Sequence, residues 1–184
     1  MVTLQEIFND IGNLTDNDFG GNDKGGKIHT YLETYDKLFK PFQQGCTFME
    51  IGLAMGDSIK LWDRYFENSK IIGVDISLVF EIEKYKNDVM LIEADATKLN
   101  FLNTIEPLMF DIIIDDSSHV TSEQISVFNS LKHKMKKGGV YIIEDLLALD
   151  IERDKYMYLH ENVEIIDMRH INGRFDNALC VIRF

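Results

Sequence analysis

Short apolar runs alternate with longer stretches of helical periodicity along most of the chain, and this alternation constrains the fold more than any other feature. Two of the longer stretches, Asp57–Glu67 and Ser122–Lys137, are expected to be helices, with Gly138 ending the second. The apolar runs suit strands that are covered on both faces. This order predicts parallel βαβ units. The five expected strands are Thr47–Leu53, Lys70–Ile76, Val89–Ala94, Phe110–Asp115 and Gly139–Glu144.

The last part of the chain has a different pattern. After a helix expected over Ala148–His160, the runs Val163–Met168 and Ala178–Phe184 follow without an expected helix between them, which predicts an antiparallel hairpin. A further helix is expected over Thr30–Phe39. The predicted fold is a Rossmann-like, doubly wound α/β sheet of seven strands, five parallel strands plus a C-terminal antiparallel hairpin. We expect one domain over residues 1–184, with a helical N-terminal preface (1–45) and a Rossmann-like core (46–184).

Charge and cysteine content exclude several classes of protein. The chain has 31 acidic and 19 basic residues and a formal net charge of −12, which argues against a nucleic-acid partner and against docking on an anionic membrane. No apolar stretch is long enough for a membrane span, and no basic secretory leader is present. Cys46 and Cys180 have no metal-ligand spacing and are expected to be reduced. These features predict a cytoplasmic protein.

The segment Glu50–Gly56 joins an expected strand to an expected helix. Its glycines, Gly52 and Gly56, would let the backbone approach a ligand, and the helix N-terminus could bind an anion such as an amino-acid carboxylate. The spacing differs from the Gly-x-Gly-x-x-Gly of dinucleotide-binding proteins. A tight turn with no ligand is the alternative interpretation.

Acidic residues end three successive predicted strands, at Glu50, Asp75 and Asp95. Asp75 is placed to accept hydrogen bonds from the hydroxyls of a ribose, and Asp95 to accept one from the exocyclic amine of an adenine. A single acidic residue there would more often cap a helix. Three acidic residues at the ends of successive strands indicate an adenosine-containing ligand that lies across the carboxyl ends of those strands.

A second acidic cluster follows the fourth and fifth predicted strands. It combines the segment Asp115–His119 with Glu144 and Asp145. Carboxylates gathered at one edge would repel each other without a cation, and hard oxygen ligands suit Mg²⁺ or Ca²⁺. His119 could then act as a general base beside the metal. The alternative is that the acids cap helices and that His119 is a surface loop residue.

These motifs together resemble those of class I S-adenosylmethionine-dependent methyltransferases. More narrowly, the chain resembles the metal-dependent sugar O-methyltransferases of macrolide biosynthesis, of the mycinamicin and macrocin type, and the related cephalosporin-hydroxylase-like proteins. The segments that carry this resemblance are Asn22–Gly25, His29–Tyr31, Asp57–Trp62, Ile114–His119 and Ile143–Leu146.

The resemblance implies roles for individual residues. It places metal ligands at Asp116, Glu144 and Asp145, with Mg²⁺ as the expected metal, and the general base at His119. The segment Asp23–Gly25 is expected to fold over the cofactor, S-adenosylmethionine. The expected cofactor-binding residues are Lys24, Glu50, Gly52, Gly56, Ser58, Asp75, Asp95 and Asp115.

Two positions depart from the family pattern. Ser117 stands where Gly is usual in Asp-Asp-Gly-Ser-His. Gly adopts a positive φ freely and Ser does not, so this position tests whether the turn needs a positive φ. Met55 and Gly56 stand where a glycine pair is usual. The long N-terminal substrate domain of the macrolide enzymes is not seen in this sequence, which leaves the substrate open.

The function expected from the sequence is methyl transfer to a hydroxyl of a sugar or a glycosylated small molecule. Two alternatives remain, a nicotinamide-dependent oxidoreductase, which would also use an acidic residue at Asp75, and a catalytically silent cofactor-binding partner. A homo-oligomer is left open.

Overall fold

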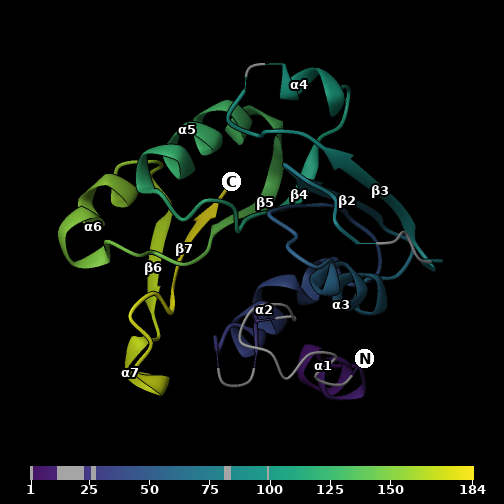
Figure 1. Cartoon of the computed structure of the whole chain (residues 1–184), viewed down its shortest axis with the longest axis horizontal. Coiled ribbons are helices and arrows are strands. Elements are labelled where there is room, and N and C mark those ends of the chain that lie inside the picture. Colours follow the sequence, from purple (N-terminus) through teal and green to yellow (C-terminus); the bar gives the residue numbers. More distant parts are fainter. Residues whose placement is uncertain (1, 12–22, 26–27, 81–83, 99) are drawn as a thin grey trace.

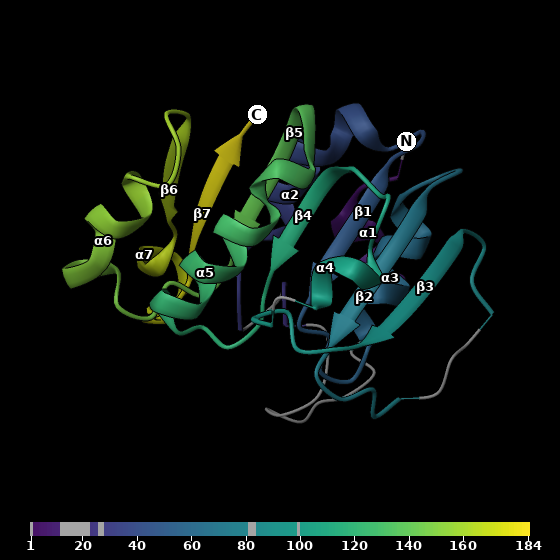
Figure 2. The same ribbon diagram turned by 90° about the horizontal axis from the view of Figure 1, so that it is seen from above.

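The computed structural model describes residues 2–11, 23–25, 28–80, 84–98 and 100–184. Within these ranges the chain forms a seven-stranded sheet with the order β3-β2-β1-β4-β5-β7-β6 (Figures 1 and 2). The first five strands are parallel, and β7 pairs antiparallel with both β5 and β6. The predicted fold class is therefore confirmed. The strands are β1 (Thr47–Ile51), β2 (Lys70–Asp75), β3 (Asp88–Glu93), β4 (Phe110–Asp115), β5 (Met135–Ile143), β6 (Val163–Asp167) and β7 (Ala178–Arg183).

Helices cover both faces of the sheet. Figure 1 shows α1, α2 and α3 on one face and α4, α5 and α6 on the other. No helix in the described part of the chain is long and apolar enough to cross a membrane. The helices are α1 (Leu4–Ile11), α2 (Leu32–Phe39), α3 (Asp57–Tyr65), α4 (Phe101–Thr104), α5 (Thr121–Leu131), α6 (Leu149–Met157) and α7 (Arg169–Asn172), with 3₁₀ turns over Lys40–Phe42 and Lys132–Lys134.

Each face of the sheet has its own apolar core. Along β4, Ile112 and Ile114 belong to the core on the side of α1, α2 and α3, whereas Ile113 belongs to the opposite core. The first core includes a cluster of aromatic rings in which Trp62 contacts Phe39 and Phe48 at centroid distances of 5.8 and 5.2 Å. Burial on both faces explains why the strands read as continuous apolar runs.

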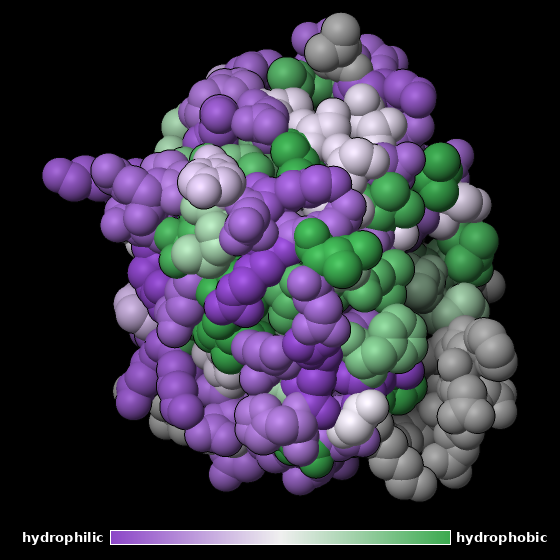
Figure 3. Space-filling view, turned by 90° about the vertical axis from the view of Figure 1, so that its left-hand side faces the viewer, coloured by the Kyte–Doolittle hydropathy of each residue, from purple (hydrophilic) through white to green (hydrophobic). Residues whose placement is uncertain are grey.

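The edge of the sheet at β6 carries the C-terminal helices. Figure 3 views the molecule from this side and shows a largely hydrophilic surface with apolar side chains gathered near its middle. Ile151 on α6 and Ile171 on α7 are both exposed. Helix α7 lies in the connection between β6 and β7, so the expectation of no helix there was wrong, although the two strands do pair antiparallel.

The helix expected over Ser122–Lys137 was also predicted too long. Helix α5 ends at Leu131, and β5 begins at Met135, which pairs with Phe110 of β4. Gly138 lies inside β5, where its amide donates to the carbonyl of Phe184 at 2.7 Å, and so does not end a helix. Pairing with strands distant in sequence outweighs the local helical pattern here.

The register of the central strands aligns their carboxyl ends. The amide of Gly52 donates to Val74 of β2 at 2.8 Å, that of Asp116 to Ile51 of β1 at 2.8 Å, and that of Glu144 to Asp115 of β4 at 3.0 Å. The residues that follow β1, β4 and β5 therefore lie side by side at one edge. This edge is where ligands bind in open α/β sheets.

Gly52 is required by this close alignment. Its φ is +90°, and a Cβ atom there would lie 1.9 Å from the carbonyl oxygen of Asp116. The backbone of the loop after β4 therefore lies too close to Gly52 to leave room for a side chain there.

We predict that Gly52→Ala lowers the free energy of unfolding by about 3 kcal/mol or more, because the new methyl group displaces the loop after β4 and the backbone is left-handed. Gly173→Ala is the matched control, since Gly173 has a φ of +76° but open space around its Cβ position. We expect a loss of only about 1 kcal/mol there. Urea denaturation measures both, and equal losses would contradict the steric explanation.

Candidate functional site

A pocket of about 290 Å³ lies at the carboxyl ends of β1 and β4. The predicted cofactor segment and the predicted acidic cluster both contribute to its wall, so the structure brings the two sequence motifs into one site. Gly52, Ser58 and Asp75 line it together with Asp23, Asp116 and His119.

Lys24 lies at the centre of the acidic cluster. Its ammonium nitrogen is 2.7 Å from Oδ2 of Asp116, 2.9 Å from Oε1 of Glu144 and 3.1 Å from Oε1 of Glu50. The side chains of Lys24, Glu50 and Glu144 are each at most 1% exposed. A buried charge of this kind is stable only when it is paired, so Lys24 and these carboxylates depend on each other.

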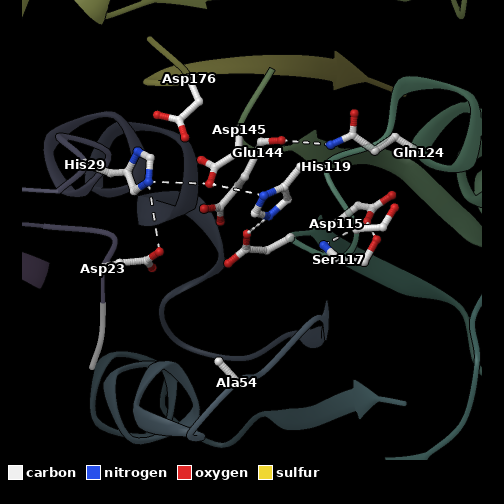
Figure 4. Close-up of polar contacts among 12 residues, drawn as sticks. Asp23, His29, Ala54, Asp115, Ser117, His119, Gln124, Glu144, Asp145 and Asp176 are labelled. Atoms are coloured by element: carbon white, nitrogen blue, oxygen red, sulfur yellow. Dashed lines mark hydrogen bonds and ion pairs between the residues drawn. The ribbon is translucent and has the colours of Figure 1, made fainter. Parts of the chain in front are cut away.

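Two tyrosines near the start of α2 hold the carboxylates that follow β5. The hydroxyl of Tyr35 donates to Oε1 of Glu144 at 2.6 Å, and that of Tyr31 donates to Oδ1 of Asp145 at 2.7 Å. Gln124 of α5 donates to the backbone carbonyl of Glu144 at 2.9 Å (Figure 4). Asp145 itself has a left-handed backbone with a φ of +54°. Strained conformations of this kind cluster at functional sites.

His119 bridges two of the carboxylates. Its Nε2 is 3.0 Å from Oδ1 of Asp116, and its Nδ1 is 3.7 Å from Oδ2 of Asp145. His119 has a φ of +56° and is partly exposed, at 29% of its side chain. The imidazole therefore points into the pocket between the ends of β4 and β5.

Ser117 does not need the left-handed backbone that a glycine would allow, because the positive φ in this loop falls on His119. The Ser117 hydroxyl instead donates to Oδ1 of Asp115 at 2.6 Å. This departure from the family pattern is therefore compatible with the turn.

The electrostatics of the cluster reflect an excess of acid over base. Burial raises the pKa of Glu144 well above its ordinary value, and burial together with the charge of Asp116 raises that of Asp145 to about 7. Burial acts in the same direction on Asp116, but the charge of Lys24 and a hydrogen bond from His119 outweigh it and lower the pKa. Burial acts to lower the pKa of His119, yet Asp116 and Asp145 raise it to about 9.

Gly52, Ser58 and Asp75, which were predicted to bind the cofactor, line the pocket in the structure. Oδ2 of Asp75 accepts from the amides of Leu53 at 2.7 Å and Ala54 at 3.2 Å, so this carboxylate shapes the loop after β1 while it lines the pocket. Gly56 is the N-cap residue of α3 and has a φ of +79°. Ser58 donates to Oε2 of Glu50 at 2.6 Å.

Four predicted cofactor residues, Glu50, Gly56, Asp95 and Asp115, are not among the residues that line the pocket. Glu50 and Asp115 are fully buried, and Glu50 also accepts from the indole of Trp62 at 3.0 Å. Asp95 follows the end of β3, where it accepts from the amide and the hydroxyl of Thr97. Their roles toward a cofactor stay predictions.

Some residues of the site were not found from the sequence. Tyr31 and Tyr35 read as part of a buried apolar helix face, and two tyrosines four residues apart were the available signal that buried hydroxyls need partners. His29 lies in one of the segments that carry the family resemblance. The structure buries it beside Asp23 and Asp145, and burial lowers its pKa to about 4.

The donor set suits a divalent cation, since Mg²⁺ prefers carboxylate oxygens. Asp116 and Asp145 group with His119, and Asp116 and Glu144 group with Glu50, with the ligand atoms of each group within 4.8 Å of one another. Lys24 already neutralises the second group. The carboxylates of Asp116 and Asp145 are thus the better placed part of the predicted metal site.

No family model matches the chain, but its sequence is similar to those of several named proteins. The 8-demethyl-8-alpha-L-rhamnosyl tetracenomycin-C 2'-O-methyltransferase of Streptomyces olivaceus is 36% identical over 136 residues, which are 68% of this chain and 35% of that protein. The mycinamicin VI 2''-O-methyltransferase of Micromonospora griseorubida is 29% identical over 133 residues, 67% of this chain and 33% of that protein. The chain thus spans about a third of the length of these relatives.

A solved structure shows the same fold. The MycE methyltransferase of the mycinamycin biosynthetic pathway, in complex with Mg, SAH and mycinamycin VI, superposes with a TM-score of 0.71 at 22% identity, covering 99% of this chain and 53% of that chain. The chain has the class I methyltransferase fold, and the resemblance seen in its sequence motifs is confirmed.

We predict that Lys24→Met lowers the free energy of unfolding by about 3–5 kcal/mol, because Glu50, Asp116 and Glu144 lose the cation that neutralises them. Lys37→Met is the matched control, since the Lys37–Glu33 pair at 2.7 Å is exposed on both sides. We expect a change there below about 0.5 kcal/mol. Urea denaturation measures both, and a Lys24 variant as stable as the Lys37 variant would contradict the pairing.

Proposed function

We propose that this chain carries the cofactor-binding and catalytic part of an S-adenosylmethionine-dependent O-methyltransferase that acts on a hydroxyl of a sugar or a glycosylated small molecule. The observation that carries the proposal is that Asp116 and His119 line one pocket together with Gly52 of the loop after β1, while the buried Asp145 lies 3.7 Å from His119. The names of the relatives, which are O-methyltransferases of glycosylated compounds, support the acceptor class.

The cofactor would occupy the side of the pocket formed by Gly52, Ser58 and Asp75. A carboxylate at the end of β2 can accept hydrogen bonds from ribose hydroxyls in addition to the loop amides that Asp75 already binds. The acidic wall favours a cationic sulfonium over the neutral thioether that remains after transfer. This preference suits binding of the methyl donor and release of the product.

A Mg²⁺ ion would be held by Asp116 and Asp145. Glu144 stays a predicted ligand, and its carboxylate is paired with Lys24 and accepts from Tyr35. When bound, such an ion supplies a positive charge that lowers the pKa of a nearby hydroxyl and offsets the carboxylates that keep His119 protonated. Asp116 and Asp145 would in addition hold the imidazole between them.

His119 would act as the general base. Bound S-adenosylmethionine would supply a methyl group on a sulfonium, which leaves a neutral thioether once the methyl group is transferred. The imidazole of His119 would accept the proton of the acceptor hydroxyl. A methyl group has no polar atom that the protein could bind directly. Alignment of the two substrates by the pocket would therefore supply much of the rate enhancement.

A nicotinamide-dependent oxidoreductase is not favoured, since the loop after β1 lacks the Gly-x-Gly-x-x-Gly spacing and the chain resembles methyltransferases. A catalytically silent cofactor-binding partner would bind the cofactor without transferring the methyl group. The cytoplasmic location and the lack of a nucleic-acid partner stay predictions from the sequence.

We predict that Asp75→Asn weakens the binding of S-adenosylmethionine at least about tenfold, because a charge-assisted hydrogen bond to the ribose is lost. Asn keeps an oxygen that can accept from Leu53 and Ala54. Isothermal titration calorimetry measures the affinity, with Asp88→Asn, a change at an exposed residue of β3, as the control. An unchanged dissociation constant would remove Asp75 from the cofactor site, and preferential binding of NAD would favour the oxidoreductase.

We predict that His119→Ala lowers turnover by about 10²–10⁴-fold on a glycoside acceptor, the usual contribution of a general base. The affinity for S-adenosylmethionine should change little, because the cofactor residues lie on the other side of the pocket. His133→Ala, at an exposed position, is the control. Near wild-type methyl transfer by the His119 variant would rule this residue out as the base.

A further inference from the structure

His29 is a buried histidine with unused ring nitrogens. Its side chain is 1% exposed, and neither Nδ1 nor Nε2 has a hydrogen-bond partner among the residues that the structure describes. Buried polar atoms without a partner are costly and uncommon in native proteins. The proposed methyl transfer assigns no role to this imidazole.

Two carboxylates face the same nitrogen of His29. Its Nε2 is 3.4 Å from Oδ2 of Asp145 and 3.9 Å from Oδ2 of Asp23, as Figure 4 shows. All three ligand atoms lie within 4.8 Å of one another. Two ligands held about 2.1 Å from one Zn²⁺ ion in tetrahedral geometry are themselves about 3.4 Å apart. The distance between His29 and Asp145 therefore already fits a shared cation, and Asp23 needs only a small approach.

Neighbouring side chains hold two of these three groups in place. The ring of Tyr31 stacks on that of His29 with centroids 4.7 Å apart and planes inclined by 20°. The Tyr31 hydroxyl also fixes Oδ1 of Asp145, which leaves Oδ2 turned toward His29. Support of this kind orients the ligands of metal sites. Asp23 is 40% exposed and lines the pocket, so a cation and its water ligands could enter from that side.

We propose that Asp23, His29 and Asp145 form a second cation site, selective for a divalent transition metal such as Zn²⁺ or Co²⁺. An imidazole nitrogen with two carboxylate oxygens favours these ions over Mg²⁺, which prefers oxygen ligands alone. Asp145 would be shared with the proposed Mg²⁺ site. Its Oδ2 also lies 3.7 Å from Nδ1 of His119, the histidine beside that site. The two sites would be adjacent but would differ in their histidine and in the ions they prefer.

The test is a titration of chelator-treated protein with Co²⁺ and with Zn²⁺ in the presence of excess Mg²⁺, which fills sites made only of oxygen. We expect visible Co²⁺ absorption typical of a nitrogen-containing site, and Zn²⁺ binding in calorimetry. His29→Gln and Asp23→Asn should each weaken this binding at least about tenfold, the lower end of the loss caused by removing even a supporting residue of a metal site.

Three further variants and a fold check complete the design. His133→Gln removes an exposed histidine and should leave the titration unchanged. Because His29 is buried, circular dichroism must show that its variant folds, and Asp23→Asn, at a partly exposed position, tests the site if it does not. His119→Gln and Asp116→Asn should reduce the binding less than His29→Gln does. The proposal is overturned by wild-type protein that binds neither ion, by binding that survives both the His29 and Asp23 changes, or by binding that depends on His119 instead.

Discussion

The ammonium group of Lys24 is the interaction on which the site depends. Three carboxylates from β1 and from the loops after β4 and β5 converge on it, and Lys24, Glu50 and Glu144 are almost completely buried. Removing the ammonium charge would leave these carboxylates without the cation that offsets them. Since Lys24 comes from a segment near the N-terminus, this one contact ties that segment to the middle of the sheet.

The cluster remains acidic even with Lys24 in place. Asp145 keeps one oxygen directed at two imidazoles, and Asp116 lies between Lys24 and His119. The raised pKa values of Glu144 and Asp145 follow from burial and from this uncompensated charge. A site with these properties attracts cations, which suits a sulfonium cofactor and a divalent metal alike.

Much of the fold could be predicted from the sequence, because the apolar runs are local features and the carboxyl ends of parallel strands must share an edge. This rule brought Asp116 and Asp145 together correctly. It could not show that Met135 pairs with Phe110 and so ends the preceding helix early, since that contact joins distant segments. For the same reason the place of Lys24 among the carboxylates was not foreseen: it lies 92 residues before Asp116 and 120 before Glu144, and no periodicity records such a contact.

The hydroxyls of Tyr31 and Tyr35 have a consequence for how the chain can be divided. The sequence suggests a helical preface over residues 1–45 and a core that begins at residue 46, as though the core could be studied alone. Yet Glu144 and Asp145, at the end of a core strand, receive their hydrogen bonds from the preface. A truncated core would lose the donors that hold both acids, together with Phe39, which packs against Trp62 in the first apolar core. Tyr31 and Tyr35 of the preface therefore belong to the candidate site, and a unit designed to keep that site has to include them.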